Sequence, residues 1–227
     1  AMDPQQRLLL ETGWEALEDA GQTPEKLTAN QTGVFIGMWS NDFEERSFGN
    51  PDQFDFHMVT GSGRYTASGR LSYLLGLQGP SITLDTACSS SLVAVHLACQ
   101  SLRMGECALA LAGGANTIWR PHVSIAFSQA QMLSPDGRCK FGDAAANGYV
   151  RSEGAGIVVL KPLSAALADH DSIYAVILGS VVNNDGRSSG SFGTPGVAGQ
   201  EDMLRKAYRQ ARVSPSKVRY VDVHGTG

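Results

Sequence analysis

The sequence predicts an α/β protein in which helices pack in layers on a buried sheet. Short apolar runs alternate along the chain with longer amphipathic segments, and glycines separate most of these runs. Hydrophobic residues make up 42% of the 227 residues and charged residues 18%. Such a chain has enough apolar side chains for a core and too few charges for disorder. No boundary or short repeat divides it.

The first expected element is a helix over residues 3–20. Asp3 is suited to the N-cap, and Gln6 stands where a capping box requires it. Gly21 supplies the C-terminal stop. The buried face of the helix is predicted at Leu10, Trp14 and Leu17.

The remaining elements continue the alternation. Runs of small and β-branched apolar residues predict strands over residues 33–37, 81–85, 108–112, 156–160, 173–182 and 220–223. Helices are expected at about residues 67–76, 89–105, 121–131, 164–169 and 200–211. The polar stretch 39–56 predicts a loop-rich insertion, and residues 134–149 and 185–199 predict long loops. In helix 89–105 the apolar face is predicted at Leu92, Val95, Cys99 and Leu102. Gly113 and Gly114 are expected to follow the strand over residues 108–112.

Charge and composition exclude several classes of protein. The net charge is −4 with no Lys/Arg cluster, which argues against nucleic-acid binding. No apolar run approaches the roughly 18 residues that span a bilayer, and the N-terminus has no signal-peptide pattern, so we expect a cytoplasmic protein without membrane contact. The four cysteines form no Cys-x-x-Cys pair and no zinc-finger spacing with histidine, so we expect no metal site and reduced thiols.

The strongest chemical signal is Cys88, which follows a predicted strand and precedes a predicted helix. Unpaired amide N–H groups and the helix dipole at such a place favour the nucleophilic thiolate. The same amides can stabilise an oxyanion on a bound thioester. A buried structural thiol capped by serines is the alternative, and the three small hydroxyl residues after Cys88 favour the nucleophile.

His224 is the second candidate. It follows a predicted strand, and the glycines beside it allow close approach of a ligand at a strand end. There an imidazole can donate a hydrogen bond to a carbonyl or move a proton, although a surface histidine fits equally well. Residues 186–199 lack nucleotide-binding motifs. Structural roles are favoured for Cys99, His96, Asp143 and Glu153.

Residues 79–92, which contain Asp85-Thr86-Ala87-Cys88-Ser89-Ser90-Ser91, resemble the nucleophile motif of β-ketoacyl synthases in type I polyketide synthases. Residues 3–7, 67–73, 148–154 and 224–227 are similar to further blocks of that family, in the same order. The resemblance implies an α/β thiolase-like layered αβαβα fold that is incomplete here. Residues 1–160 would hold most of the first half, and residues 161–227 would begin the second.

The resemblance also implies roles for three residues. Cys88 would carry the growing acyl chain as a thioester, and His224 would hold the malonyl thioester carbonyl during decarboxylation. Thr226 would bind the pantetheine arm of the substrate. No cofactor would be bound directly, because the phosphopantetheine belongs to the acyl carrier protein. Other polyketide synthase domains would be further partners, and the parent domain would form a homodimer through residues near 81–86.

Two departures from the family pattern lead to expectations about activity. The second histidine and the lysine that the family requires would lie beyond Gly227, so we expect the isolated chain to be inactive. Asn147 and Gly142 stand where Asp and Phe are more usual in the family. The alternatives to a ketosynthase segment are a non-catalytic truncated scaffold and a thiolase-like acyl-CoA enzyme.

Overall fold

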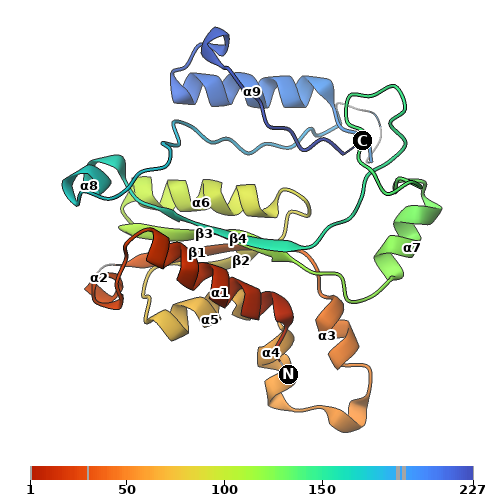
Figure 1. Ribbon diagram of the computed structural model, residues 1–227, viewed down its shortest axis with the longest axis horizontal. Coiled ribbons are helices and arrows are strands. Elements are labelled where there is room, and N and C mark those ends of the chain that lie inside the picture. Colours follow the sequence, from red (N-terminus) through yellow and green to blue (C-terminus); the bar gives the residue numbers. More distant parts are fainter. Residues whose placement is uncertain (1, 30, 188–189, 191–192, 227) are drawn as a thin grey trace.

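The computed structural model describes residues 2–29, 31–187, 190 and 193–226. A four-stranded mixed sheet with the order β2-β1-β3-β4 lies at the centre of this part (Figure 1). Strands β1, β2 and β3 are parallel, and β4 runs antiparallel to β3. The strands are β1 (Thr32–Met38), β2 (Ser81–Leu84), β3 (Leu109–Asn116) and β4 (Gly154–Leu160).

The helices surround the sheet and connect its strands. They are α1 (Pro4–Asp19), α2 (Pro24–Ala29), α3 (Asp42–Ser47), α4 (Phe56–Ser62), α5 (Thr66–Leu75), α6 (Ser90–Met104), α7 (His122–Gln129), α8 (Leu163–Ala168) and α9 (Val197–Ala211). Two short 3₁₀ turns are η1 (Pro51–Gln53) and η2 (Pro215–Lys217).

The two faces of the sheet bury different side chains. Large residues on one face, such as Val34, Ile36 and Leu111, pack against α1 and α5. Small residues on the other face, such as Ala110 and Ala112, pack with Phe35 against α6. Because successive strand residues point to opposite faces, this alternation lets α6 lie closer to the sheet than a face of leucines would allow.

A further layer lies beyond α6. Residues 173–182 and α9 lie on the side of α6 away from the sheet (Figure 1). The imidazole Nδ1 of His96 on α6 is 2.9 Å from the hydroxyl of Ser180, whose amide donates to Gln210 Oε1 at 3.0 Å. Helix α6 therefore lies between the sheet and this second layer, as the predicted layered α/β architecture requires.

The N-terminal helix differs from its prediction in its buried face. Leu9, Gly13 and Leu17 are buried in α1, whereas Trp14 is 46% exposed. Gly13 faces Leu71 of α5, because a Cβ on Gly13 would lie 2.9 Å from that side chain. Because Gly13 has no Cβ, α1 packs closely against α5. This contact, rather than the spacing of the apolar residues, determines which face of α1 is buried.

The predicted capping box of α1 is half correct. The carboxylate of Asp3 accepts from the Gln5 amide at 2.8 Å and caps the helix. Gln6 does not complete the box, because its side chain crosses to other elements. Its amide donates to the Gly61 carbonyl at 2.9 Å and its oxygen accepts from Arg70 at 2.7 Å. Long-range hydrogen bonds to α4 and α5 therefore replace the local one.

Helix α6 begins and ends within a residue of its prediction, and Gly105 stops it in a left-handed conformation. Its predicted face is wrong at Leu92, which is 75% exposed, while Ala94 and Ala98 are fully buried. Helix α6 lies against alanine and glycine positions of the sheet, where only small side chains fit. The Leu92 side chain therefore stays in solvent, although the apolar spacing of the helix places it on the buried face.

Three glycines in the sheet allow backbones to approach. Gly113 and Gly114 lie inside β3, and not after it as predicted. A Cβ on Gly113 would lie 2.0 Å from the Gly156 carbonyl oxygen of β4, and one on Gly114 would lie 2.6 Å from that of Gly37. A Cβ on Gly37 would lie 2.5 Å from the Ser91 nitrogen at the start of α6. Glycine inside a strand often marks such a close approach.

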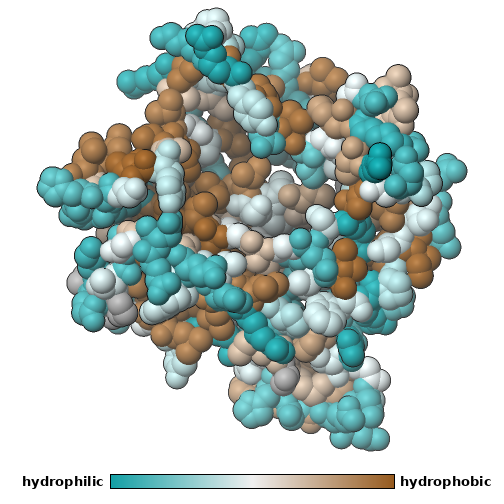
Figure 2. Space-filling model, viewed as in Figure 1, coloured by the Kyte–Doolittle hydropathy of each residue, from teal (hydrophilic) through white to brown (hydrophobic). Residues whose placement is uncertain are grey.

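Two predicted strands, 173–182 and 220–223, are extended but unassigned, because neither has a hydrogen-bonded strand neighbour among the described residues. Apolar side chains such as Ile177 and Leu178 remain exposed there. Figure 2 shows hydrophobic groups gathered over α8 and this region.

Residues 39–56 contain α3 and η1 and are more ordered than predicted. Helix α9 begins at Val197, and residues 188, 189, 191 and 192 of the predicted loop lie outside the described residues.

No helix in the described part of the chain is both long enough and apolar enough to cross a bilayer.

The contact between Gly37 and α6 yields a stability prediction. Gly37→Ala would force a methyl group into the backbone of residues 90 and 91, and such overpacking costs about 1–3 kcal/mol. We expect a lower midpoint in urea unfolding. Gly69→Ala is the control, because Gly69 is exposed on α5 with no atom within 4 Å of the added methyl. It should be neutral or stabilising by up to about 1 kcal/mol. Equal effects would contradict the proposed packing.

Candidate active site

Cys88 lies in the turn that connects β2 to α6. The turn starts at Asp85, directly after β2, and ends at Ser89, the N-cap of α6. The Cys88 side chain is exposed. The thiol therefore lies at the carboxyl edge of the three parallel strands, where ligands commonly bind in α/β proteins. This placement agrees with the predicted strand–nucleophile–helix arrangement.

Hydrogen bonds hold this turn in a strained conformation. Ala87, directly before Cys88, has φ of 55°, which residues with a Cβ rarely adopt. The Asp85 carboxylate accepts from the Ala87 amide at 2.9 Å. The hydroxyl of Ser90 accepts from the Thr86 amide at 2.8 Å and donates to the Ala87 carbonyl at 2.6 Å. The Ser89 hydroxyl donates to the Thr86 carbonyl at 2.9 Å, so Ser89 and Ser90 both help to build the turn.

The start of α6 provides positive electrostatic potential beside the thiol. The first amide groups of a helix have no partner within it, and the peptide dipoles of α6 add a partial positive charge there. Cys88 precedes the N-cap Ser89 by one residue, so a thiolate at Cys88 lies within reach of this potential. A nucleophilic thiol is the chemistry that this environment favours.

The predicted loop of residues 134–149 lies beyond the same edge of the sheet (Figure 1). Its ends are joined by hydrogen bonds from the Tyr149 amide to the Met132 carbonyl at 3.0 Å and from the Ser134 amide to the Tyr149 carbonyl at 2.9 Å. Gly148 has φ of 128°, and a Cβ there would lie 2.6 Å from the Ser134 nitrogen. Glycine is therefore required where the loop returns to its own start.

The interior of this loop contains a polar network. The amide oxygen of Asn147 accepts from Lys140 Nζ at 2.9 Å and from the Ser134 hydroxyl at 3.2 Å. Lys140 also pairs with Asp136 at 2.6 Å. Proximity to Lys140 and a hydrogen bond from Ser134 hold the pKa of Asp136 below its usual value. Asn147 thus supplies the acceptor oxygen that an aspartate would supply.

The loop contacts the C-terminal segment. Burial raises the pKa of Tyr149, where the loop ends, and a negative charge on Cys88 would raise that pKa further. At the other side of the loop the Phe141 ring lies 3.3 Å from the Cβ position of Gly225. Figure 1 shows the C-terminal segment beside this loop. His224 and Thr226 are exposed on either side of Gly225.

The other predicted residues have structural partners. Cys99 and Cys107 are buried, and burial raises the pKa of Cys99. His96 bonds Ser180. The Glu153 carboxylate accepts from the Ile118 amide at 2.6 Å and that of Asp143 from the Ala145 amide at 2.8 Å, so both anchor loops, as predicted. Within the described ranges, no group of His, Cys, Asp and Glu side chains could hold a metal ion.

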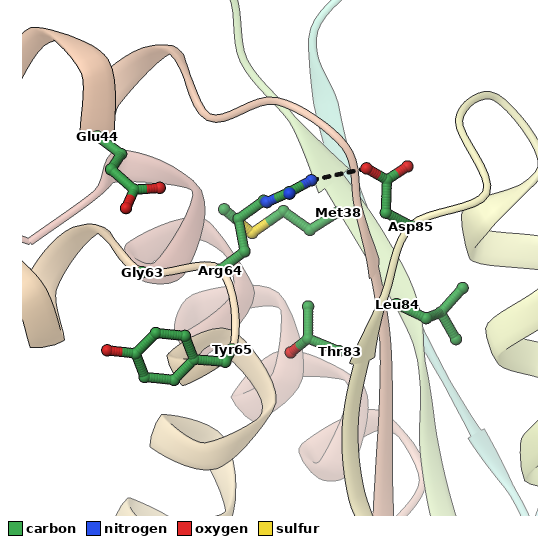
Figure 3. A pocket seen from close by; sticks show the side chains of 8 residues that line it. All are labelled: Met38, Glu44, Gly63, Arg64, Tyr65, Thr83, Leu84 and Asp85. Carbon is green, nitrogen blue, oxygen red and sulfur yellow. Dashed lines mark hydrogen bonds and ion pairs between the residues drawn. The ribbon is translucent and has the colours of Figure 1, made fainter.

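A pocket of about 350 Å³ lies next to the Cys88 turn and was not predicted (Figure 3). Arg64 crosses it from the segment before α5 and pairs with Asp85 at 2.7 Å. Its lining includes Glu44, Tyr65 and Thr83. No motif connects Arg64 to Cys88, because the two meet only through the fold. An arginine with an aspartate 21 residues later is too common to indicate a pair.

Comparison with known proteins identifies the family. Residues 1–166 match the β-ketoacyl synthase N-terminal domain model, and residues 174–227 match the C-terminal domain model. The chain belongs to the β-ketoacyl synthase family. The resemblance inferred from the motifs around Cys88 is therefore confirmed.

Polyketide synthases are among the similar proteins. One phenolphthiocerol/phthiocerol polyketide synthase protein of Mycobacterium tuberculosis is 52% identical over the whole chain, which covers 15% of that protein. Another protein of the same synthase is 51% identical over 229 aligned positions, and the chain covers 10% of it. The chain thus spans a small part of the length of these relatives.

Solved ketosynthase structures share the fold. The ketosynthase from module 6 of the Bacillus subtilis bacillaene synthase superposes with a TM-score of 0.90 at 41% identity, covering 99% of this chain and 37% of that one. The oxazolomycin ketosynthase domain of Streptomyces albus gives a TM-score of 0.90 at 39% identity, covering 100% of this chain and 39% of that one. The predicted partial thiolase-like fold is confirmed by these likenesses.

The exposure of the four thiols predicts the order of their alkylation. Iodoacetamide at neutral pH should modify Cys88 first, because it is exposed at the start of a helix. Cys99 and Cys107 are buried and should react at least about tenfold more slowly. Peptide-resolved mass spectrometry measures each rate. The exposed Cys139 is the internal control, and labelling of Cys139 with an inert Cys88 would contradict the assignment.

Proposed function

We propose that this chain forms the nucleophile-bearing part of a ketosynthase that extends acyl chains by decarboxylative Claisen condensation. The observation that carries the proposal is the exposed Cys88 on a strained turn at the start of α6. The substrates are an acyl thioester and a malonyl-type thioester, both carried on the phosphopantetheine arm of an acyl carrier protein. The proposed partners are that carrier and the other domains of a polyketide synthase.

In the first step the Cys88 thiolate attacks the acyl thioester carbonyl. A tetrahedral oxyanion forms, and amide N–H groups near the start of α6 are suited to stabilise it. The carbon–sulfur bond to the carrier then breaks, and the carrier thiolate leaves and takes a proton from solvent. The acyl group is now bound to Cys88 as a thioester, with no change in oxidation state.

In the second step the malonyl thioester loses carbon dioxide, and its electron pair forms an enolate. The enolate carbon attacks the thioester carbonyl on Cys88, so that a carbon–carbon bond forms and the bond to Cys88 sulfur breaks. The thiolate is regenerated, and the β-keto product remains on the carrier. The role proposed for His224 is to donate a hydrogen bond to the malonyl thioester carbonyl and so stabilise the enolate.

Thr226 completes the proposed site. Its exposed hydroxyl, two residues after His224, is suited to hydrogen-bond the pantetheine arm of the carrier. The contact of Phe141 with Gly225 supports this placement, because it holds the segment against the loop of residues 134–149, at the end of the sheet where Cys88 lies. We further propose that residues 1–160 belong to the first half of the thiolase-like fold and residues 161–227 to the second.

Because the isolated chain is expected to be inactive, three substitutions in the whole parent domain test these roles with carrier-bound substrates. Cys88→Ala should abolish acyl transfer, because no thioester can form. His224→Ala should lower the decarboxylation rate about 10²- to 10³-fold, the usual cost of an oxyanion donor. Thr226→Ala should raise KM with kcat less affected, because it removes a binding contact. Radiolabelled acyl transfer and carbon dioxide release are the measurements, and Cys139→Ala is the control.

Two results would contradict the proposal. Retained acyl transfer in Cys88→Ala would assign the nucleophile to another group. Equal turnover of acyl-CoA and acyl-carrier substrates by the unaltered protein would instead favour a thiolase-like enzyme.

We propose that the domain forms a homodimer through the free edge of β2. This strand is at the end of the sheet, and Ser81 and Ile82 are exposed. An edge strand with unpaired backbone groups can pair with a second copy. The turn that carries Cys88 continues from β2, so dimerisation would support the site.

A charge at this edge should dissociate the dimer. Ile82 is 42% exposed, and Ile82→Glu would place a carboxylate in the interface without disturbing a buried core. Light scattering coupled to size exclusion should show the mass falling to half. Trp14→Glu on α1 is the matched control, because Trp14 is 46% exposed and lies on a helix away from the β2 edge. An unchanged mass in Ile82→Glu would rule out this interface.

A further inference from the structure

Arg64 reaches across the pocket in Figure 3 to the ends of two neighbouring strands. Its Nη1 donates to the Trp39 carbonyl, directly after β1, at 3.0 Å. The same nitrogen donates to Asp85 Oδ2, directly after β2, at 2.7 Å. One guanidinium thus ties the carboxyl ends of two neighbouring parallel strands together.

The Asp85 carboxylate carries this restraint to the nucleophile. While Oδ2 accepts from Arg64, Oδ1 accepts from the Ala87 amide at 2.9 Å. A carboxylate held at both oxygens has little rotational freedom, so its orientation fixes the peptide that it bonds. That peptide belongs to Ala87, whose φ of 55° must be enforced by its surroundings.

We propose that Arg64 is a positioning residue for the Cys88 nucleophile, which acts through the Asp85 carboxylate on the strained backbone of Ala87. The inference rests on the proposed function of Cys88 and adds a residue to it. Arg64 contacts neither substrate nor sulfur in this role. It keeps the turn in the one conformation that presents Cys88 at the start of α6.

The exposure of the Arg64–Asp85 ion pair and the choice of Asp85 over Glu44 as partner are both consistent with this role. The side chains of Arg64 and Asp85 are 37% and 36% exposed, so the ion pair adds little to global stability. Its effect should therefore be local. Glu44 also lines the pocket, yet Arg64 points to Asp85 and not to Glu44 (Figure 3). The bond to the Trp39 carbonyl explains this preference, because it directs the guanidinium toward the strand ends.

The test measures the alkylation rate of Cys88 by iodoacetamide, with peptide-resolved mass spectrometry on the whole protein. Arg64→Gln should slow Cys88 about tenfold, in proportion to the fraction of molecules that leave the competent turn, and should leave Cys139 unchanged. Arg64→Lys keeps the charge and should stay within about threefold of the unaltered protein. Arg120→Gln is the matched control, because Arg120 forms a similarly exposed pair with Glu45 at 2.9 Å. It should have no effect.

A double-mutant cycle separates positioning from general damage. Glycine adopts positive φ without strain, so Ala87→Gly should make the turn less dependent on Arg64. We expect Arg64→Gln to cost less than about threefold in that background. Equal costs in both backgrounds, or an effect of Arg120→Gln as large as that of Arg64→Gln, would overturn the proposal. An unreactive Cys88 in the unaltered protein would instead contradict the proposed function.

Discussion

The arrangement of the site depends on one close contact, between the start of α6 and the backbone of the central strands. Gly37 on β1 and Gly114 on β3 lie beneath Ser90 and Ser91, where no side chain could fit. Because the helix starts in contact with the sheet, the chain must change direction within the few residues between β2 and α6. The positive φ of Ala87 and the exposure of Cys88 both follow from this constraint.

Helix α6 has a second role as the layer shared by two parts of the chain. Its alanine face contacts the sheet, and His96 on another face bonds Ser180 in the layer beyond. Residues far apart in the sequence thereby reach the same edge of the molecule. The loop of residues 134–149 lies at this edge and contacts the C-terminal segment through Phe141 and Gly225.

The sequence predicts local features of this structure better than long-range ones. The position of Cys88 between a strand and a helix was correctly predicted, because the apolar strand, the hydroxyl residues and Gly105 are local signals. The buried faces of α1 and α6 were wrong at Trp14 and Leu92, because close packing at small residues outweighs apolar periodicity. Arg64 could not be predicted, since only the assembled strand ends bring it to Asp85. Residues 173–182 have strand composition, but assignment as a strand also requires a neighbour.

Asn147 has a consequence for the behaviour of its loop in acid. A carboxylate in its place would lose its charge on protonation and weaken its hold on Lys140. An amide has no such proton to gain, so the bond from Lys140 Nζ to Asn147 does not titrate at that end. Asp136, the other partner of Lys140, stays ionised to lower pH than a free aspartate. The loop beside Cys88 should therefore keep its shape in mildly acidic surroundings.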